Sequence, residues 1–392
     1  MDINEVLERG VENILPTKEG LATLMSQKKI TLYQGFDPSM PSLHLGNFVG
    51  LMKLRAFQKL GHKVIFLVGD FTGMIGDPTD KTSSRKQLTR EQVLKNSASW
   101  KEQVSRVLDF DGDNPAKIMS NSEWNDKVSF KDLIEITSHF TVQQFLERDM
   151  FQKRLEKNEP IYLHEFLYPV AQGNDCVAMD VDLEIGGSDQ IFNMLAGRAL
   201  MRATKGKDKY VLGTKLLVDK DGNKVGKTTG NALFLDSKPN DFYAGVMSFP
   251  DETVALGFEL LTETDLSGIE EKVKKDPMLE KKRLAFEVTK LLWGEDTAKK
   301  AEEAFEQTFQ KREIPTEIST IKVKLDSLPL LDLVFSTKEV SSRSEAKRLI
   351  SQKAIEVEGE VKTDPSEEIR VTKAGLVIKI GKKKFVKVIL QP

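Results

Sequence analysis

Two short apolar segments near the start of the chain end in glycine and aspartate. ITLYQGFD occupies residues 30–37 and KVIFLVGD occupies residues 63–70. Segments of this length and ending are typical of buried strands in a parallel sheet. Between them, apolar residues recur at helical spacing at Leu51, Leu54, Phe57 and Leu60. A strand, a helix and a strand in this order predict a right-handed crossover in a parallel sheet.

Two Thr-x-x-Gln sequences, at residues 89–92 and 141–144, predict further helix starts. In such a capping box, each side chain accepts a hydrogen bond from the backbone N–H group of the other residue. Together with the predicted strands, these helices indicate an α/β domain over residues 1–235. We expect it to be built on a Rossmann-like parallel sheet.

The pattern changes after SKPND at residues 237–241. Charged segments with helical spacing follow, and little reads as strand before about Ile321. A small helical domain is therefore predicted for residues 236–325. In residues 326–392, the helical segment SRSEAKRLISQK precedes three alternating segments, IEVEG, GLVIKIG and KFVKVIL. This pattern predicts a compact α+β domain.

Charge is unevenly distributed, although the 392 residues include 58 basic and 60 acidic side chains. From Lys338 to the end, 13 lysines and arginines face 8 acidic residues, a net charge of +5. By difference from the formal net charge of −2, the preceding residues carry −7. An acidic body with a basic tail indicates nucleic acid contacts late in the chain.

Cys176 is the single cysteine, which excludes an internal disulfide framework and a metal site made of cysteines. This usage is typical of a reducing compartment. The start, MDINEVLERG, is acidic and amphipathic, and no apolar run approaches the roughly 20 residues that span a bilayer. We therefore expect a cytoplasmic protein with no signal peptide, no transmembrane helix and no membrane partner.

The segment FDPSMPSLHLGN, residues 36–47, joins the first predicted strand to the following helix. In open parallel sheets, ligands bind at the carboxyl ends of the strands, where helix amino termini point at them. His44 and Asn47 can donate hydrogen bonds to phosphate oxygens there, and Gly46 lets a nucleotide approach the backbone. A structural role, in which His44 only caps the helix, is equally consistent with HLGN.

Two glycine-rich segments carry basic residues suited to polyphosphate. GDFTGMIGDPTDKTSSRK, residues 69–86, contains Lys81 and Arg85 and is long for a structureless connection. LVDKDGNKVGKTTGN, residues 217–231, carries two lysines without the frame of a P-loop. Solvated surface loops are the alternative, but length in the first case and flanking glycines in the second favour loops that close on a ligand.

The segment 163–193 combines an apolar helix with a glycine turn. Tyr168, Gln172 and Asp175 are spaced four and three residues apart, so they share one helix face. Such polar side chains need partners, which either a bound polar ligand or an internal network supplies. GGSDQ then places Asp189, an acceptor suited to a ribose hydroxyl, beside Gln190.

Together these motifs resemble those of the bacterial tyrosyl-tRNA synthetases, a family of class I aminoacyl-tRNA synthetases. HLGN is similar to the HIGH signature of the class, and KVGKT is similar to its KMSKS signature. The tyrosyl family's own motifs are matched by YQGFDPS, GMIGDPT, LYPVAQGND and IGGSDQ. The resemblance covers the whole chain, and residues 341–364 resemble an S4 domain. It implies a catalytic domain over residues 1–235, a helical anticodon-binding domain over 236–325 and an S4-like RNA-binding domain over 326–392.

The resemblance implies a tyrosine-tRNA ligase. Such an enzyme makes tyrosyl-adenylate and pyrophosphate from L-tyrosine and ATP, then transfers tyrosine to the 3′-terminal ribose of tRNA(Tyr). Tyr33 and Asp175 are implied at the phenol. The other tyrosine-binding residues implied are Asp77, Tyr168 and Gln172 at the ammonium group, and Gln190 near the carboxylate.

For ATP, the resemblance implies contacts from Asp37, Gly187 and Asp189 to the adenylate, the last two at the ribose. The residues implied at the phosphates are His44, Gly46, Asn47, Lys81, Arg85, Lys224, Lys227 and Thr228. ATP would enter with Mg²⁺, and no tightly bound, protein-ligated metal is expected. A homodimer joined through the catalytic domain is also implied.

Three positions depart from the family pattern. Asn47 replaces the second histidine of HIGH, and Gly226 replaces the first serine of KMSKS. Glu184 stands where many family members have glutamine, and the substrate's ammonium group could balance its charge.

Three other functions are weighed against this interpretation: an RNA-binding or regulatory protein that makes no adenylate, a nucleotidyltransferase without tRNA, and a tryptophanyl enzyme. The intact signature residues argue against the first. The basic residues Arg343, Lys347 and Arg348 on a predicted RNA-binding helix disfavour the second. The pair Tyr33 and Asp175, suited to a hydroxyl group, favours tyrosine over tryptophan.

Overall fold

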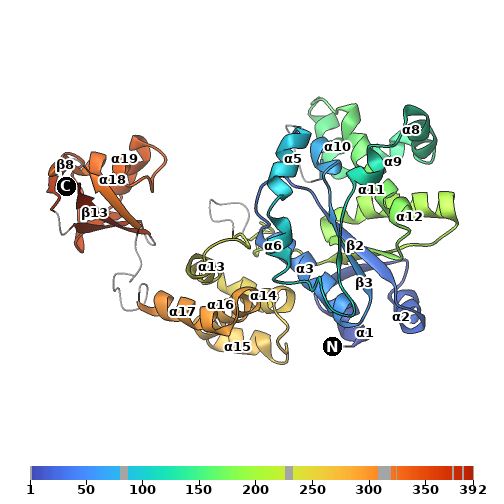
Figure 1. Ribbon diagram of the computed structural model, residues 1–392, viewed down its shortest axis with the longest axis horizontal. Coiled ribbons are helices and arrows are strands. Elements are labelled where there is room, and N and C mark those ends of the chain that lie inside the picture. Colours follow the sequence, from blue (N-terminus) through green and yellow to red (C-terminus); the bar gives the residue numbers. More distant parts are fainter. Residues whose placement is uncertain are drawn as a thin grey trace. The chain divides into compact units, whose positions relative to one another are not determined.

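A parallel sheet forms the centre of the computed structural model (Figure 1). The predicted strand, helix and strand are β2 (Thr31–Phe36), α3 (Leu45–Lys59) and β3 (Lys63–Val68). β2 and β3 pair in parallel along their whole length, as predicted. The sheet has six strands in the order β1-β6-β5-β2-β3-β4. Its other strands are β1 (Val11–Leu15), β4 (Lys117–Ser120), β5 (Leu183–Gly187) and β6 (Tyr210–Thr214), of which β1 is antiparallel to β6.

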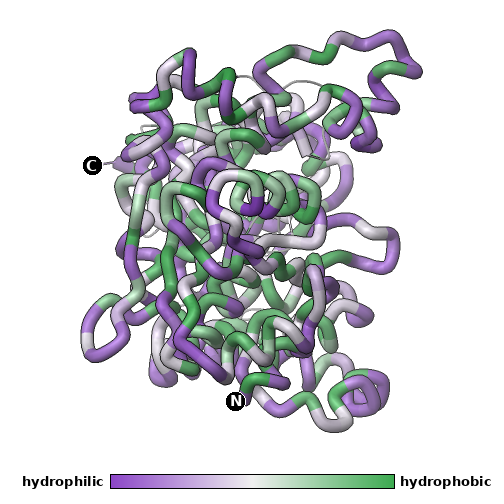
Figure 2. Tube along the Cα trace, turned by 90° about the vertical axis from the view of Figure 1, so that its right-hand side faces the viewer, coloured by the Kyte–Doolittle hydropathy of each residue, from purple (hydrophilic) through white to green (hydrophobic). Residues whose placement is uncertain are grey.

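The structure describes residues 2–79, 87–225, 233–307, 319–323, 325–372, 375–381 and 384–391. It divides into two compact units, Met1–Glu302 and Glu303–Pro392. No helix in these described ranges is long and apolar enough to cross a membrane. Figure 2 shows the hydrophobic residues running through the interior of the trace, while most of the turns that project from it are hydrophilic.

Buried apolar side chains hold α3 against the sheet. Leu51, Leu54 and Phe57 are fully buried, as their helical spacing predicted, whereas Leu60, the fourth residue of that pattern, is the C-cap of α3 and only partly buried. α11 (Leu163–Met179) and α12 (Ile191–Lys205) pack against each other. The smaller helices of this part are α1 (Ile3–Glu8), α2 (Lys18–Gln27), α4 (Thr72–Ile75), α5 (Arg90–Ser97), α6 (Trp100–Val104), α7 (Ser122–Asn125), α8 (Phe130–Thr137), α9 (Val142–Leu146) and α10 (Asp149–Glu156).

Both predicted capping boxes are present. Thr89 caps α5 with Gln92 as its partner, and Thr141 caps α9 with Gln144. The segment 69–86 is not structureless where it is described, because α4 forms a helical turn within it. The sequence analysis predicted a loop here and did not predict α4.

The helical segment after residue 237 belongs mostly to the first unit. Its helices are α13 (Pro239–Val246), α14 (Val254–Leu261), α15 (Ile269–Lys275), α16 (Pro277–Trp293) and α17 (Glu295–Phe305). The Arg9 guanidinium ties α14 to the start of the chain by donating to the carbonyl oxygens of Phe258, at 2.8 Å, and Thr262, at 2.7 Å. Such contacts explain why one compact unit spans residue 235. The three-domain division stays a prediction.

The second unit is a small α+β fold, as predicted. A five-stranded sheet has the order β10-β9-β12-β13-β7, and α18 (Leu330–Ser336) and α19 (Arg343–Ser351) pack together. The strands are β7 (Ser319–Val323), β8 (Ser327–Pro329), β9 (Ile355–Val357), β10 (Glu360–Val361), β11 (Glu368–Arg370), β12 (Leu376–Ile380) and β13 (Lys384–Leu390). Leu333, Ile350 and Ile378 are fully buried in its core.

Candidate active site

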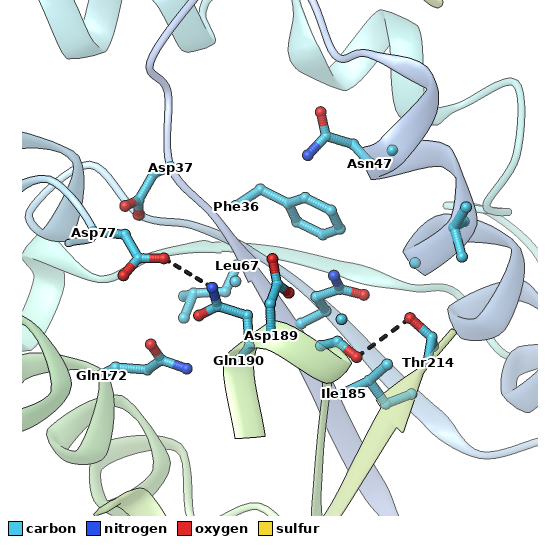
Figure 3. A pocket seen from close by; sticks show the side chains of 18 of the residues that line it. Phe36, Asp37, Asn47, Leu67, Asp77, Gln172, Ile185, Asp189, Gln190 and Thr214 are labelled. Carbon is cyan, nitrogen blue, oxygen red and sulfur yellow. Dashed lines mark hydrogen bonds between the residues drawn. The ribbon is translucent and has the colours of Figure 1, made fainter. Parts of the chain in front are cut away.

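A single cavity in the first unit brings the predicted site residues together. It lies at the carboxyl ends of β2 and β5, beside the start of α3, which is where open α/β sheets bind ligands. The predicted residues that line it are Tyr33, Asp37, His44, Gly46, Asn47, Asp77, Tyr168, Gln172, Asp175, Gly187, Asp189, Gln190 and Lys224. Figure 3 shows Asp37 and Asp77 on one side of this cavity and Asn47 across from them.

His44 and Asn47 form a reciprocal cap at the start of α3. The Asn47 backbone N–H donates to His44 Nδ1 at 3.2 Å, and the His44 backbone N–H donates to Asn47 Oδ1 at 3.0 Å. A Cβ atom on Gly46 would lie 2.9 Å from His44 Cε1, so glycine lets the ring lie against the backbone. His44 therefore caps the helix and also lines the cavity. Because Nδ1 accepts a bond, a neutral ring carries its proton on Nε2.

Asp37 is held at the end of β2 by two hydroxyl groups. Tyr168 donates to its Oδ2 at 2.9 Å, and Thr72 donates to its Oδ1 at 2.7 Å. A Cβ atom on Gly69 would lie 2.2 Å from Asp37 Oδ1, so only glycine leaves room for the carboxylate. Burial, and then the charge of Asp37, raise the pKa of Tyr168 well above its usual value, which keeps this phenol protonated.

Asp175 lies on the face of α11 that lines the cavity, and its carboxylate accepts hydrogen bonds from three side chains. Trp124 Nε1 donates to its Oδ1 at 2.7 Å, Asn125 Nδ2 donates to Oδ1 at 2.9 Å, and Asn121 Nδ2 donates to Oδ2 at 3.1 Å. Burial raises the pKa of Asp175 to about 8 despite these three bonds. The sequence analysis did not predict the three donors, and no local pattern marks them.

Glu184 is neutralised inside the protein, which corrects the expectation that a substrate ammonium group balances its charge. Its Oε2 is paired with the ammonium group of Lys209, and both side chains are almost completely buried. Its Oε1 accepts from the Tyr33 hydroxyl at 2.6 Å and from Gln172 Nε2 at 2.8 Å. Lys209 was not predicted, because a lysine just before a strand is usually a surface residue.

Asp77 is fixed by a set of amide and hydroxyl donors. Gln190 Nε2 donates to its Oδ2 at 2.8 Å, a bond drawn in Figure 3, and Thr79 Oγ1 donates to its Oδ1 at 2.6 Å. Asn193 Nδ2 in turn donates to Gln190 Oε1 at 2.9 Å. Asp77, predicted at the substrate's ammonium group, and Gln190, predicted near its carboxylate, are therefore neighbours.

Asp189 and Lys224, which both line the cavity, form an ion pair. Lys224 Nζ lies 2.7 Å from Asp189 Oδ2. A Cβ atom on Gly187 would lie 2.5 Å from Asp189 Oδ1, so this turn requires glycine. The pair brings residues of the IGGSDQ and KVGKT motifs together across 35 positions of sequence.

Four predicted residues lie outside the described ranges: Lys81, Arg85, Lys227 and Thr228. Among the residues that are described, no three His, Cys, Asp or Glu side chains are grouped as metal ligands. The described site combines hydrogen-bond donors with carboxylates, a set that suits a polar organic ligand.

Two family models match the chain. Residues 25–310 match the model described as tRNA synthetases class I (W and Y), and residues 328–373 match the S4 domain. Two curated relatives, both named tyrosine–tRNA ligase, come from Aquifex aeolicus and Idiomarina loihiensis. They are 40% and 41% identical, over 98% and 97% of this chain and 97% and 96% of their own lengths.

Solved structures give the same picture. A C-terminally truncated mitochondrial tyrosyl-tRNA synthetase from Coccidioides posadasii aligns with a TM-score of 0.64 at 25% identity, covering 77% of this chain and 90% of its own. A tyrosyl-tRNA synthetase from Archaeoglobus fulgidus, complexed with L-tyrosine, aligns with a TM-score of 0.59 at 20% identity, covering 77% and 100%, and supports the fold. The family model and the near-full-length relatives together establish that the chain belongs to the class I tyrosyl-tRNA synthetases.

Proposed function

We propose that this cavity is where the chain, as a tyrosine–tRNA ligase, joins L-tyrosine to ATP. The observation that carries the proposal is the convergence of thirteen predicted residues, from distant motifs, on one cavity at the ends of parallel strands. The product, tyrosyl-adenylate, would then donate tyrosine to the 3′-terminal ribose of tRNA(Tyr).

The hydrogen bonds seen around the tyrosine site suit the proposed roles. Tyr168 donates its proton to Asp37, and Gln172 donates its amide protons toward Glu184. Both therefore keep an oxygen lone pair for the substrate's ammonium group, alongside the carboxylate of Asp77. Tyr33 and Asp175 would meet the phenol. Gln190, held beside Asp77, would lie near the substrate carboxylate.

For ATP, we propose that Asp37, Gly187 and Asp189 contact the adenylate, with the ribose at the last two. His44 and Asn47 would meet the phosphates where α3 begins and Gly46 allows close approach. ATP would enter as its Mg²⁺ complex, and Lys224 would leave Asp189 to follow the departing pyrophosphate. By resemblance, the further phosphate contacts are Lys81, Arg85, Lys227 and Thr228.

The reaction needs positive donors rather than a protein nucleophile. In the first step a carboxylate oxygen of tyrosine attacks the α-phosphorus, and the bond from that phosphorus to the bridging oxygen of pyrophosphate breaks. Donors that meet the charge developing on pyrophosphate stabilise the transition state, each by roughly 10²- to 10³-fold. In the second step a ribose hydroxyl of tRNA attacks the carbonyl carbon, and AMP leaves. Cys176 takes no part, because burial raises the pKa of its thiol.

The S4 domain is proposed to bind tRNA. Arg343, Lys347 and Arg348 lie on the exposed face of α19, in the second unit. Arg343 pairs with Asp332 at 2.9 Å and lies over the ring of Phe335, which orients its guanidinium. A basic helix on a compact fold suits the recognition of an RNA backbone by shape and charge.

A homodimer through the catalytic part is proposed as well. α8 buries none of its side chains, and Phe130 and Ile134, one turn apart on it, are 79% and 57% exposed. Val142 at the start of α9 and Leu163 at the start of α11 are also exposed apolar residues. Exposed apolar surface of this kind is typical of protein interfaces. We place the protein in the cytoplasm, where ATP and tRNA are available.

Tyrosine-dependent exchange of labelled pyrophosphate into ATP tests the proposed activity. Exchange with L-tyrosine, but not with tryptophan or phenylalanine, is the expected result. Exchange with tryptophan would favour the tryptophanyl alternative, and no exchange with any amino acid would favour a binding protein. Aminoacylation of tRNA then separates the ligase from a nucleotidyltransferase.

A further inference from the structure

A chain of buried polar groups lies behind the proposed phenol site. Lys209 is fully buried, and its ammonium group donates to Glu184 Oε2, to the Met194 carbonyl oxygen at 3.0 Å and to Cys176 Sγ at 3.1 Å. Glu184 lines the cavity, whereas Lys209 is not among the residues that line it. The other carboxylate oxygen, Glu184 Oε1, accepts a hydrogen bond from the Tyr33 hydroxyl.

The surrounding backbone is shaped to hold this pair. A Cβ atom on Gly197 of α12 would lie 2.6 Å from Cys176 Sγ and 2.9 Å from Lys209 Nζ, so no side chain fits there. A buried ion pair is a weak source of stability, because both charges lose their hydration. Its presence beside the cavity therefore calls for a role other than stabilising the fold.

The pair determines which way the hydrogen bond at Tyr33 runs. Burial opposes the charged form of Lys209, but Cys176 and Glu184 outweigh it and raise the pKa of Lys209, so the ammonium group stays charged. An ionised Glu184 can only accept hydrogen bonds. Burial also raises the pKa of Tyr33 well above its usual value, so the phenol keeps its single proton. The Tyr33 hydroxyl donates to Glu184 Oε1 at 2.6 Å, its shorter contact. Cys176 Sγ lies 3.1 Å from the same hydroxyl, and because burial raises the pKa of the Cys176 thiol, this thiol keeps a proton that it can donate to Tyr33.

We propose that Lys209 is a positioning residue for substrate recognition: by holding Glu184 as an acceptor, it makes the Tyr33 oxygen accept a hydrogen bond from the substrate's para group. The inference rests on the proposed placement of the phenol at Tyr33. A para substituent that donates a proton fits this arrangement. A para substituent without a proton to donate places its lone pairs against those of the Tyr33 oxygen, which is unfavourable.

The test compares three amino acids in the pyrophosphate exchange assay: L-tyrosine, 4-amino-L-phenylalanine and 4-fluoro-L-phenylalanine. The wild-type enzyme is expected to have a higher kcat/KM with the amino compound than with the fluoro compound. Lys209→Met removes the cation that holds Glu184 as an acceptor, so the hydrogen bond between Glu184 and Tyr33 can run the other way, with the Tyr33 proton pointing at the substrate. The ratio of amino to fluoro kcat/KM should then fall about tenfold, the effect of one hydrogen bond of ordinary net strength. The KM for ATP should not change.

A second variant guards against misfolding. Glu184→Gln with Lys209→Met leaves no unpaired buried charge, and the glutamine amide can likewise donate to Tyr33. The same fall in the ratio is expected. Lys205→Met is the matched control, because Lys205 is an exposed lysine at the end of α12, four residues before Lys209, and its ratio should equal that of the wild type.

A folded single or double variant that keeps the wild-type ratio would overturn the role of Lys209. Failure of the proposed function is distinguishable, since the wild-type enzyme itself would then show no tyrosine-dependent exchange, and the inference would fall with it.

Discussion

The side chains of His44 and Asn47 each accept a hydrogen bond from the other's backbone, so the residue that replaces the second histidine of the HIGH signature is half of a helix cap. Capping needs only the Asn47 oxygen, whereas contact with a phosphate needs its N–H₂ group. The two roles can therefore be separated by substitution.

Asn47→Asp retains the capping oxygen but brings a negative charge toward the phosphates. We expect a melting temperature near that of the wild type and a loss of roughly 100-fold in the rate of pyrophosphate exchange. Asn47→Ala should lose the donor and about 1 kcal/mol of stability as well. Thermal unfolding and exchange kinetics give both readouts. An Asn47→Asp enzyme with wild-type exchange would show that Asn47 has only a structural role.

Asp175 predicts a specific dependence of stability on pH. Because folding raises its pKa from the usual 3.8 to about 8, the folded state holds a proton that the unfolded state has released between these values. The free energy of unfolding therefore falls as pH rises through this window and levels off above it. Between pH 6 and 8, the loss should be about 2 kcal/mol greater in the wild type than in Asp175→Asn.

Chemical denaturation of both proteins at each pH measures this difference, and other titrating groups cancel in the comparison. Equal slopes would contradict the raised pKa. The same variant should raise the KM for tyrosine and leave the KM for ATP unchanged. An unchanged tyrosine KM would remove Asp175 from the phenol site.

The exposed apolar surface of α8 is proposed to form the dimer interface, so a charged side chain introduced there should dissociate the dimer. Ile134→Asp should shift the protein to monomer in sedimentation velocity at micromolar concentration, because a buried unpaired carboxylate opposes association. Met278→Asp, on α16 and similarly exposed, is the control and should remain a dimer. A dimer that tolerates Ile134→Asp would place the interface elsewhere, and a monomeric wild type would exclude it.

The basic helix α19 predicts that tRNA affinity depends on salt. Log Kd should rise linearly with log salt concentration, and Lys347→Gln should reduce that slope by about one, as expected for one lost phosphate contact. Lys362→Gln is the control, because Lys362 is already paired with Glu360 and Glu367. A Kd that stays constant over a tenfold range of salt would argue against phosphate recognition.

Local patterns predicted much of this fold. β2, α3 and β3 follow from apolar runs and spacing, and the caps at Thr89 and Thr141 follow from four residues each. β1 and β4 were not predicted, because VENIL and KIMS mix polar and apolar residues without a regular period.

The residues around the substrate show the same limit. Resemblance to a family gave thirteen of the residues that line the cavity. The Glu184–Lys209 pair was missed because it joins positions 25 apart through the folded sheet and helix, which leaves no local pattern. The amide donors behind Asp175 are about 50 positions away from it in sequence, so only the fold reveals them.

A crystal structure of the protein soaked with a non-hydrolysable tyrosyl-adenylate analogue tests the central claim most directly. The account predicts that the phenol lies against Tyr33 and Asp175, and that the ribose lies at Gly187 and Asp189. An analogue bound at another surface, or density for no analogue at a saturating concentration, would contradict it.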